Sequence, residues 1–165
     1  MKIQKASGPL AGRTTLAGIA GAAVAAMLFA VVPQLEGVRP VGYLDPVGIA
    51  TKCMGDTTDV VVGRVYSDAE CLASMERQLV AHADGVLRCT PSLKGHDNQL
   101  SAAVLLAYNI GVQRYCASTV ARRFNTGEFK GGCAAFTPYN KAGGKVLPGL
   151  VHRRAVERAL CEKGL

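Results

Sequence analysis

The sequence predicts an α+β domain that is mostly helical, carries a small β-lobe and is preceded by an N-terminal membrane helix. Three observations predict this class. Residues 14–35 hold no charged side chain, residues 47–51 and 60–66 are rich in β-branched side chains, and later segments show apolar residues at helical spacing. A chain of 165 residues suits one domain, so we expect an N-terminal segment, 1–35, and a body, 36–165.

The N-terminal segment has the length of a transmembrane helix. About 20 residues span a hydrocarbon core of about 30 Å. Lys2, Lys5 and Arg13 precede residues 14–35, and because positive charge stays in the cytoplasm, the body should lie on the far side of the membrane. Much of the segment is alanine and glycine, whose small apolar area should hold it only weakly in a bilayer.

A cleaved signal peptide is the alternative to an uncleaved anchor. The apolar run is longer than the usual core of a signal peptide, and bulky Leu28 stands two residues before Ala30, the best small residue for cleavage. These features favour the anchor. Pro33 is expected to end or kink the helix where it leaves the membrane.

Four helices are expected after the β-lobe. Ser67 and Glu70 form a capping box, S-x-x-E, which opens a helix that runs to about Ala83. Residues 99–110 are apolar all round, which predicts a buried central helix. The last two helices are expected at 116–125, ended by Gly127, and at 149–162, with Arg153, Arg154, Glu157 and Arg158 on the polar side.

The cysteines predict disulfides in an oxidising compartment. Their number is even and their spacing wide; they are Cys53, Cys71, Cys89, Cys116, Cys133 and Cys161. A metal site helped by His82, His96 and His152 is disfavoured, because zinc sites usually contain close pairs such as C-x2-C. We therefore expect no metal or cofactor, and three bonds: Cys53–Cys71, Cys116–Cys133 and, by elimination, Cys89–Cys161.

The net charge of +7 favours polyanionic partners such as nucleic acid, anionic lipid or anionic cell-wall polymers. Solvated helix faces without any partner explain the same charge equally well. The sequence shows neither an aromatic-rich RNA-binding motif nor a helix-turn-helix pattern, so no nucleic-acid partner is expected.

Two carboxylates and a hydroxyl form the candidate catalytic set. Glu36 is the first acidic residue of the chain, Asp45 follows in a Gly/Pro-rich turn, and Thr51 ends the first predicted strand. Glycoside hydrolysis needs a proton donor and a second carboxylate that attacks, activates water or stabilises the cationic sugar. The two carboxylates take different roles when the acid sits in an apolar pocket and its neighbour stays ionised.

The spacing E-x8-D-x5-T resembles the phage-type lysozymes, the T-even and lambdoid muramidases. Three stretches carry the likeness in the right order: the hairpin letters E-G-V-R, Y-L-D-P-V-G and T-K-C-M-G within 36–55, the helix V-L-L-A-Y-N-I-G at 104–111, and A-G-G-K-V-L-P-G-L-V-H-R-R-A-V-E-R at 142–158. The likeness therefore covers nearly all of the chain after the anchor.

This resemblance implies a lysozyme-like fold and an endolysin that hydrolyses the β-1,4 bond between N-acetylmuramic acid and N-acetylglucosamine in peptidoglycan. It implies that Glu36 is the general acid, that Asp45 orients a water or stabilises the oxocarbenium-like sugar, and that Thr51 helps hold the water. The family is generally inverting, which places the carboxyl groups about 6.5–9.5 Å apart. The alternatives are a lytic transglycosylase, which needs only one acid/base glutamate, and a non-catalytic cell-wall-binding protein.

Two positions depart from the family pattern. Asp56 stands where the family usually has histidine, and Tyr139 stands near the usual tryptophan in a chain that has no tryptophan. We expect Asp56 either to shift the pKa of Asp45 or to make a different structural contact.

The anchor resembles that of the signal-anchor-release (SAR) endolysins, in which a weakly apolar helix tethers an inactive enzyme and later joins the soluble fold. Residues 14–35 contain no cysteine, so the resemblance implies activation by refolding rather than by disulfide exchange. The implied location is the host inner membrane, with the N-terminus cytoplasmic and the body periplasmic, and then the soluble periplasm as a monomer.

Overall fold

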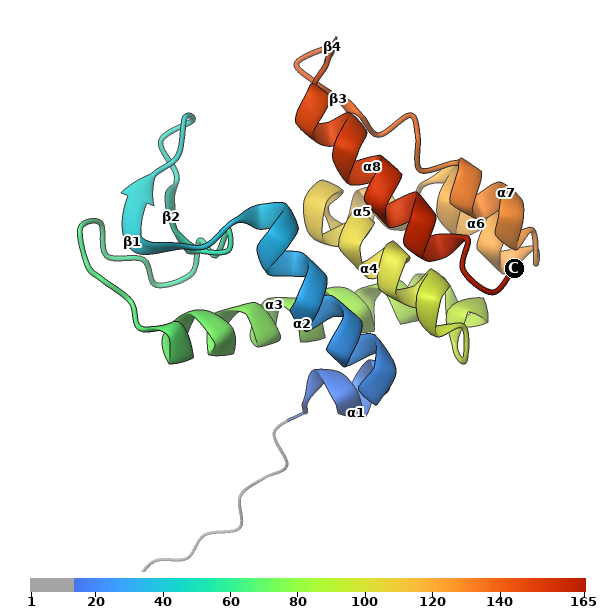
Figure 1. The fold of residues 1–165 in the computed structure, drawn as a ribbon, viewed down its shortest axis with the longest axis horizontal. Coiled ribbons are helices and arrows are strands. Elements are labelled where there is room, and N and C mark those ends of the chain that lie inside the picture. The colour runs from blue at the N-terminus through green and yellow to red at the C-terminus, as the bar shows by residue number, and fades with distance from the viewer. Residues whose placement is uncertain (1–13) are drawn as a thin grey trace, which may run out of the picture.

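The computed structural model describes residues 14–165; Lys2, Lys5 and Arg13, for which we expect a cytoplasmic location, lie outside the described residues. Within that range the chain forms a mostly helical body with two small antiparallel hairpins (Figure 1). The predicted α+β class is confirmed.

The N-terminal segment forms two helices rather than one. Helix α1 spans Leu16–Ala20 and helix α2 spans Ala22–Glu36, and Gly21 separates them with φ +95° and ψ 154°. Among the described residues, no helix combines the length and apolar character needed to cross a bilayer. Pro33 lies inside α2 and does not end it, because the helix continues to Glu36.

Both helices contribute to the same hydrophobic core as the rest of the chain. Leu16, Val24, Leu28 and Val32 are almost completely buried. Helix α1 packs on α3 (Asp68–Cys89), and α2 packs on α4 (Asp97–Ile110). The segment is therefore an integral layer of this fold.

The β-lobe is a hairpin of β1 (Arg39–Leu44) and β2 (Ala50–Cys53), in which Tyr43 pairs with Thr51. The strand predicted at 47–51 is thus shifted, since its first half forms the turn. The strand predicted at 60–66 is wrong: this stretch is a folded loop, in which only Val65 forms a β-bridge to β1, opposite Val41.

The loop lies so close to β1 that only glycine fits at one position. A Cβ atom on Gly42 would lie 2.2 Å from the carbonyl oxygen of Val61. The amide of Gly42 donates to Arg64 O, and its carbonyl accepts from the amide of Gly63. These bonds fold the β-branched stretch back onto the hairpin in place of a regular strand.

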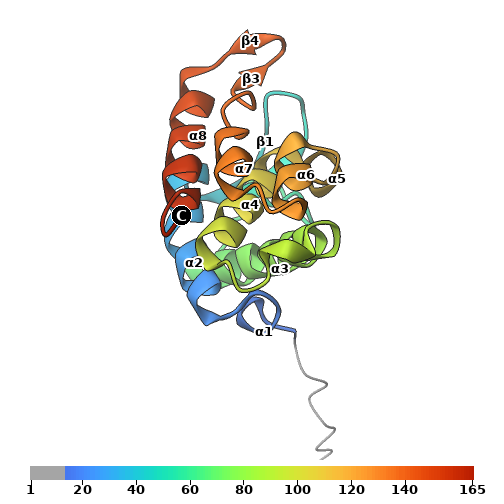
Figure 2. The same ribbon diagram turned by 90° about the vertical axis from the view of Figure 1, so that its right-hand side faces the viewer.

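The helical body surrounds α4 (Asp97–Ile110). Figure 2 shows α4 in the middle, with α2 and α8 (Pro148–Cys161) on one side and α3 below. Leu105, Leu106 and Ala107 have no exposed surface, which confirms the predicted buried helix. The smaller elements are η1 (Pro91–Leu93), α5 (Val112–Cys116), α6 (Thr119–Asn125), α7 (Phe129–Ala134), β3 (Lys141–Ala142) and β4 (Lys145–Val146).

The predicted capping box at the start of α3 is present. Ser67 Oγ accepts from the amide of Glu70, and the Glu70 carboxylate accepts from the amide of Ser67. Helix α3 then continues to Cys89, beyond the predicted end, because the apolar pattern continues through buried Val86. The helix predicted at 116–125 corresponds to α6, which begins later, at Thr119, with Ser118 as its N-cap; Cys116 is the last residue of the separate helix α5.

Six cysteines form three disulfides, and two of the three expected pairings are wrong. Cys53–Cys71 is confirmed and ties the hairpin to α3. The other two bonds are Cys89–Cys116 and Cys133–Cys161, each with Cα atoms 5.6 Å apart. The expected pairs Cys116–Cys133 and Cys89–Cys161 fail because α3 packs on α5 and α7 packs on α8, which brings different partners within bonding distance.

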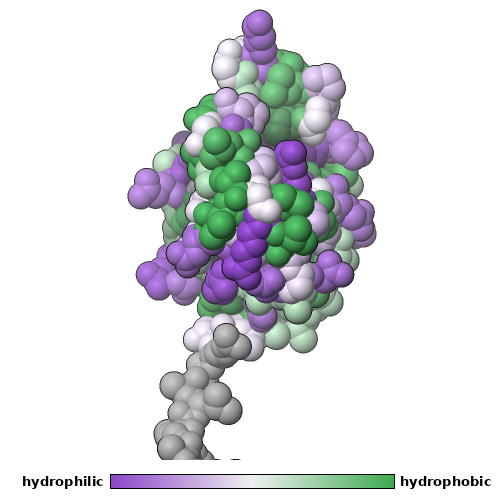
Figure 3. Space-filling view, turned by 90° about the vertical axis from the view of Figure 1, so that its left-hand side faces the viewer, coloured by the Kyte–Doolittle hydropathy of each residue, from purple (hydrophilic) through white to green (hydrophobic). Residues whose placement is uncertain are grey.

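The β-lobe leaves many aliphatic side chains exposed. Figure 3 shows apolar groups on the face of the molecule where the lobe lies. The exposed residues of the hairpin and the following loop are Val38, Val41, Leu44, Val47, Ile49, Val61, Val62 and Val65.

Candidate active site

Glu36 occupies the last position of α2, at the junction with the β-lobe. Gly37 follows with φ +70° and donates its amide to Pro33 O, which ends the helix and turns the chain into β1. The Glu36 side chain is 20 % exposed, and its Oε1 accepts a hydrogen bond of 2.5 Å from Arg153 Nη1. The expected wholly apolar pocket is therefore absent around Glu36, because a guanidinium lies against the carboxylate.

Arg153 belongs to a buried network on α8. Its Nε donates to Glu157 Oε1 over 3.0 Å, and its Nη2 donates to Leu105 O over 3.3 Å. Arg154 Nη2 also donates to Glu157 Oε1, over 2.6 Å. Arg153, Arg154 and Glu157 are all buried, so the prediction that they lie on a polar outer side of this helix is wrong.

The hairpin turn fixes the carboxylate of Asp45. Its Oδ1 accepts from the amides of Val47, over 3.0 Å, and Ile49, over 2.8 Å. Among the described residues, Oδ2 makes no hydrogen bond to the protein. Thr51 lies in β2, nearly buried, and its hydroxyl donates to Ile49 O over 3.0 Å. Asp45 and Thr51 are thus both oriented by the backbone of Ile49.

Asp56 makes the structural contact that was one of its two expected roles. It is buried, accepts from Ser74 Oγ on α3 and from the amide of Thr58 over 2.9 Å, and lies 3.7 Å from Lys52 Nζ. Burial raises the pKa of Asp56, but the hydrogen bonds and the Lys52 charge outweigh it and hold the pKa below its ordinary value. Its carboxylate therefore fastens the end of the hairpin to α3.

Tyr108 connects the central helix to the same region. Its hydroxyl donates to Met54 O over 2.8 Å, and its ring lies 5.0 Å from the ring of His82. Burial raises the pKa of the Tyr108 phenol well above its ordinary value, and the negative charges of Glu36 and Asp56 raise it further. The phenol therefore stays protonated as a hydrogen-bond donor.

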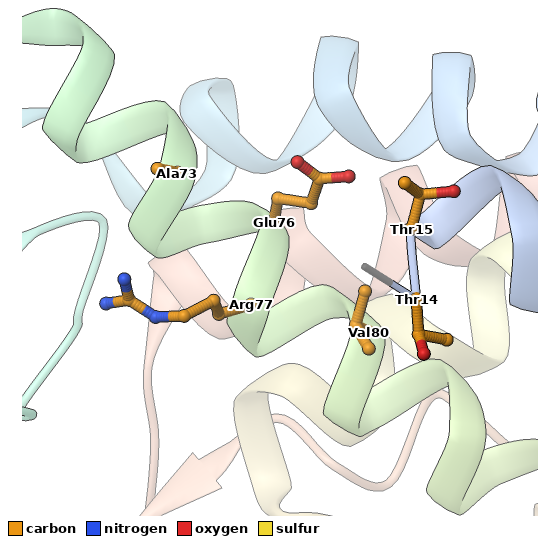
Figure 4. A pocket seen from close by; sticks show the side chains of 6 residues that line it. All are labelled: Thr14, Thr15, Ala73, Glu76, Arg77 and Val80. Carbon is orange, nitrogen blue, oxygen red and sulfur yellow. The ribbon is translucent and has the colours of Figure 1, made fainter. Parts of the chain in front are cut away.

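Two surface hollows lie near the candidate site, but neither is lined by Glu36, Asp45 or Thr51. One of about 420 Å³ lies between α2 and α8 and includes Arg153; its other lining residues are Gln34, Leu35, Leu147, Gly149, Leu150 and His152. Another, of about 270 Å³, lies between the start of α1 and α3 (Figure 4). Its lining residues, labelled in Figure 4, include none of Glu36, Asp45 and Thr51, so we assign it no part in catalysis.

Arg153 and Glu157 are the site residues that sequence reasoning missed. Arg153 follows Glu36 by 117 positions, so nothing in the local sequence connects them. A signal was present, however: R-R-x-x-E in one helix places both arginines one turn from the glutamate. Tyr139, near the usual tryptophan, lies with its ring 5.6 Å from the Arg114 guanidinium, and its carbonyl accepts from Arg154.

The site joins a glutamate at a helix end to a hairpin that carries an aspartate and a threonine, beside a helical body. This combination of fold and site defines a lysozyme-like glycoside hydrolase. The family model for phage lysozyme matches residues 33–157, and the chain belongs to the phage lysozyme family, in its SAR-endolysin subgroup. It is a lysozyme, a muramidase of the endolysin type.

Individual relatives agree with this assignment. A SAR-endolysin of Bacteriophage PS119 is 35 % identical over 164 residues, which cover 94 % of this chain and 96 % of that protein. A solved structure of a P22 lysozyme mutant is 27 % identical, with a TM-score of 0.70 over 81 % of this chain and 94 % of that one. The active form of P1 phage endolysin Lyz shares the fold, with a TM-score of 0.74 at 23 % identity over 81 % of this chain and 82 % of that one.

Proposed function

We propose that this muramidase hydrolyses the β-1,4 bond between N-acetylmuramic acid and N-acetylglucosamine in bacterial peptidoglycan, and that Glu36, Asp45 and Thr51 perform the reaction. One observation carries the assignment of roles: Glu36 ends α2, and the hairpin that begins three residues later presents Asp45 and Thr51 with their side chains fixed by backbone hydrogen bonds.

Glu36 is the proton donor in this proposal. It is half-buried at the junction of the two parts of the fold, where a glycan strand that contacts both would pass. Protonation of the glycosidic oxygen lets the bond break with an oxocarbenium-like transition state. General acid catalysis of this kind is typically worth about 10²–10⁴-fold in rate.

Asp45 and Thr51 position the attacking water. Asp45 Oδ1 is occupied by two amides, which leaves Oδ2 to accept a proton from water. The Thr51 hydroxyl donates its hydrogen bond to Ile49 O, so toward water its oxygen acts only as an acceptor. A water held by both acceptors has its lone pair free for the anomeric carbon.

This arrangement favours hydrolysis over the two alternatives. A lytic transglycosylase forms a 1,6-anhydro sugar without water and gains nothing from a second fixed carboxylate and a hydroxyl. A protein that only binds the cell wall needs none of the three side chains in fixed orientations.

The test compares the released, purified enzyme with Glu36→Gln on peptidoglycan, followed by analysis of the sugar ends. We expect new reducing ends from the wild type and background levels from Glu36→Gln, because glutamine keeps the shape but lacks the acidic proton. Glu76→Gln, the same change at a half-buried glutamate of α3, should leave the rate unchanged. Near-normal activity of folded Glu36→Gln, or 1,6-anhydro products from the wild type, would contradict the proposal.

We further propose that residues 14–35 are first a membrane anchor that exports the body to the periplasm, and that the structure described here is the released, monomeric form. Two observations support this. The segment is uncharged, and the β-lobe that follows it exposes the aliphatic face of Figure 3, which suits a position at the bilayer surface. Glu36 follows Pro33 by three residues, so tethering would hold it at the lipid headgroups.

A further inference from the structure

A buried carboxylate with no role in the proposed reaction so far is linked to Glu36 through the side chain of Arg153. Glu157, on α8, has no exposed surface. Its Oε1 accepts from Arg153 and Arg154, while its Oε2 has no hydrogen-bond partner among the described residues. Leaving one oxygen of a buried carboxylate unpaired is costly, so the position calls for an explanation.

The guanidinium of Arg153 lies between two carboxylates. Its Nη1 is 2.5 Å from Glu36 Oε1, and its Nε is 3.0 Å from Glu157 Oε1. The third donor, Nη2, is fixed on the backbone of α4 at Leu105 O. With its side chain only 7 % exposed, Arg153 has little freedom to turn away from either carboxylate.

If Glu36 is the general acid, as proposed above, the position of Arg153 affects whether Glu36 carries its proton. A general acid must carry a proton, whereas a neighbouring cation favours the ionised carboxylate. An arginine whose charge is balanced on its other side holds Glu36 less strongly. Burial raises the pKa of Glu157, whereas the charges and hydrogen bonds of Arg154 and Arg153 act against that rise. Paired with both arginines, the Glu157 carboxylate supplies the balancing charge.

We propose that Glu157 is a positioning residue for the reaction: it holds Arg153 beside Glu36 and neutralises its charge, so that Glu36 is oriented and still able to take up a proton. The other groups that face this network are Arg154, which shares the Glu157 carboxylate, Tyr108 on α4, and the backbone carbonyl of Tyr139, which accepts from Arg154.

The test is the pH–rate profile of peptidoglycan hydrolysis by purified Glu157→Gln. Glutamine can still accept from both arginines but carries no charge. The pH at which activity falls by half on the alkaline side should therefore move down by roughly one unit. Near neutral pH the rate should fall by about tenfold and recover toward the wild-type rate in acid.

Glu162→Gln is the matched control. It is the same substitution on an adjacent turn, in a carboxylate that pairs with Arg158 over 2.7 Å but is 45 % exposed. Solvent screens that charge, so the profile should coincide with that of the wild type. A purely structural role for Glu157 predicts a different result, namely a loss by the same factor at every pH.

If Glu157→Gln does not fold, a second variant tests whether Glu157 balances the charge of Arg153. In Arg154→Met the Glu157 carboxylate is left to Arg153 alone, so the alkaline limb should move to higher pH. A uniform loss in Glu157→Gln, or an unmoved profile in Arg154→Met, would overturn the proposal for Glu157. Because both are measured in active enzyme, either result would leave the muramidase assignment intact; only the failure of Glu36→Gln to abolish hydrolysis bears on that.

Discussion

Asp56 shows that a position at which the sequence departs from the family pattern makes a buried structural contact. The family usually places histidine here, and this chain places a carboxylate that faces Lys52, Ser74 and, over 3.6 Å, Arg77. Its pKa is held below the ordinary value of 3.8, so the folded protein binds fewer protons than the unfolded chain at that site. The resulting stability is present above the ordinary value and is lost as the pH falls through the depressed one.

Asp56→Asn should therefore destabilise the protein near neutral pH and flatten its response to acid. Hydrogen bonds to charged groups contribute about 1.5–3 kcal/mol, which for a chain of this size lowers the melting temperature by roughly 2–4 °C per kcal/mol. The measurement is thermal unfolding from pH 7 down to pH 3. Asp59→Asn is the control, since Asp59 is exposed in the same loop and asparagine tolerates its φ of +49°. Equal melting temperatures for the two variants would show that the Asp56 network contributes nothing.

At the scale of single residues, the sequence predicts those whose signal is local. The spacing of Glu36, Asp45 and Thr51 suggests a catalytic set because all three belong to one continuous stretch, and their roles stay a prediction. Arg153 and Glu157 were placed on the wrong side of their helix, because charged residues are normally exposed and only tertiary packing shows that Glu36 and Arg153 pair with one another.

At the scale of elements, the break at Gly21 distinguishes the structure described above from the proposed membrane-anchored state of residues 14–35. A segment that crosses a bilayer must satisfy every backbone group internally, which requires one continuous helix. In the structure the helix is broken, and Gly21 has φ +95° and ψ 154°. This region of backbone space is essentially restricted to glycine and costs other residues about 1–3 kcal/mol.

Gly21→Ala should consequently favour the tethered state. Alanine stabilises a continuous helix by about 1 kcal/mol relative to glycine and adds the backbone cost to the broken form. The sum, about 2–4 kcal/mol, should slow or reduce release by on the order of a hundredfold. A Cβ at this position would meet no atom within 4 Å, so crowding does not complicate the result. The measurement is the soluble periplasmic fraction over time after induction.

Gly18→Ala separates the backbone effect from the change in hydropathy. Gly18 lies within α1, where alanine is favourable, and its Cβ would require only a small shift of Thr15 Oγ1, 3.3 Å away. Both variants make the anchor equally more apolar, so only Gly21→Ala should be retained strongly. Equal retention of the two would contradict a role for the break.

The elements were predicted well where a periodic pattern or a cap is strong, as in α3, α4 and α8. The strand expected at 60–66 failed because β-branched residues favour strands only when a neighbouring strand is available, and here Gly42 lets the loop fold over β1 instead. The disulfide pairing failed for a similar reason. Six cysteines allow fifteen connectivities, and helix packing, which the sequence does not display, selects among them.

For the whole molecule, the proposed release mechanism requires residues 14–35 to suit two environments, the bilayer and the folded core. In the folded state one face is buried, including Ala20 and Ala25, whereas Ala22, Ala23 and Ala26 are exposed. The structure thus distinguishes positions where the segment can be made more apolar without disturbing the core from positions where larger side chains would overpack it.

The triple variant Ala22→Leu, Ala23→Leu and Ala26→Leu should hold the enzyme in the membrane while leaving the released fold intact. Each leucine near the centre of a membrane helix contributes about −0.3 to −0.6 kcal/mol, so three deepen insertion by about 1–2 kcal/mol, roughly a tenfold change in the equilibrium. Lysis should be delayed in step with a smaller soluble periplasmic fraction. Serine at the same three positions should advance both. Purified Leu-variant protein, released by detergent, should hydrolyse peptidoglycan at the wild-type rate, which separates retention from damage to the site. If the leucine variant entered the periplasm as fast as the wild type, or lysed cells on schedule while membrane-bound, a cleaved signal or a permanently active anchored enzyme would replace the release mechanism.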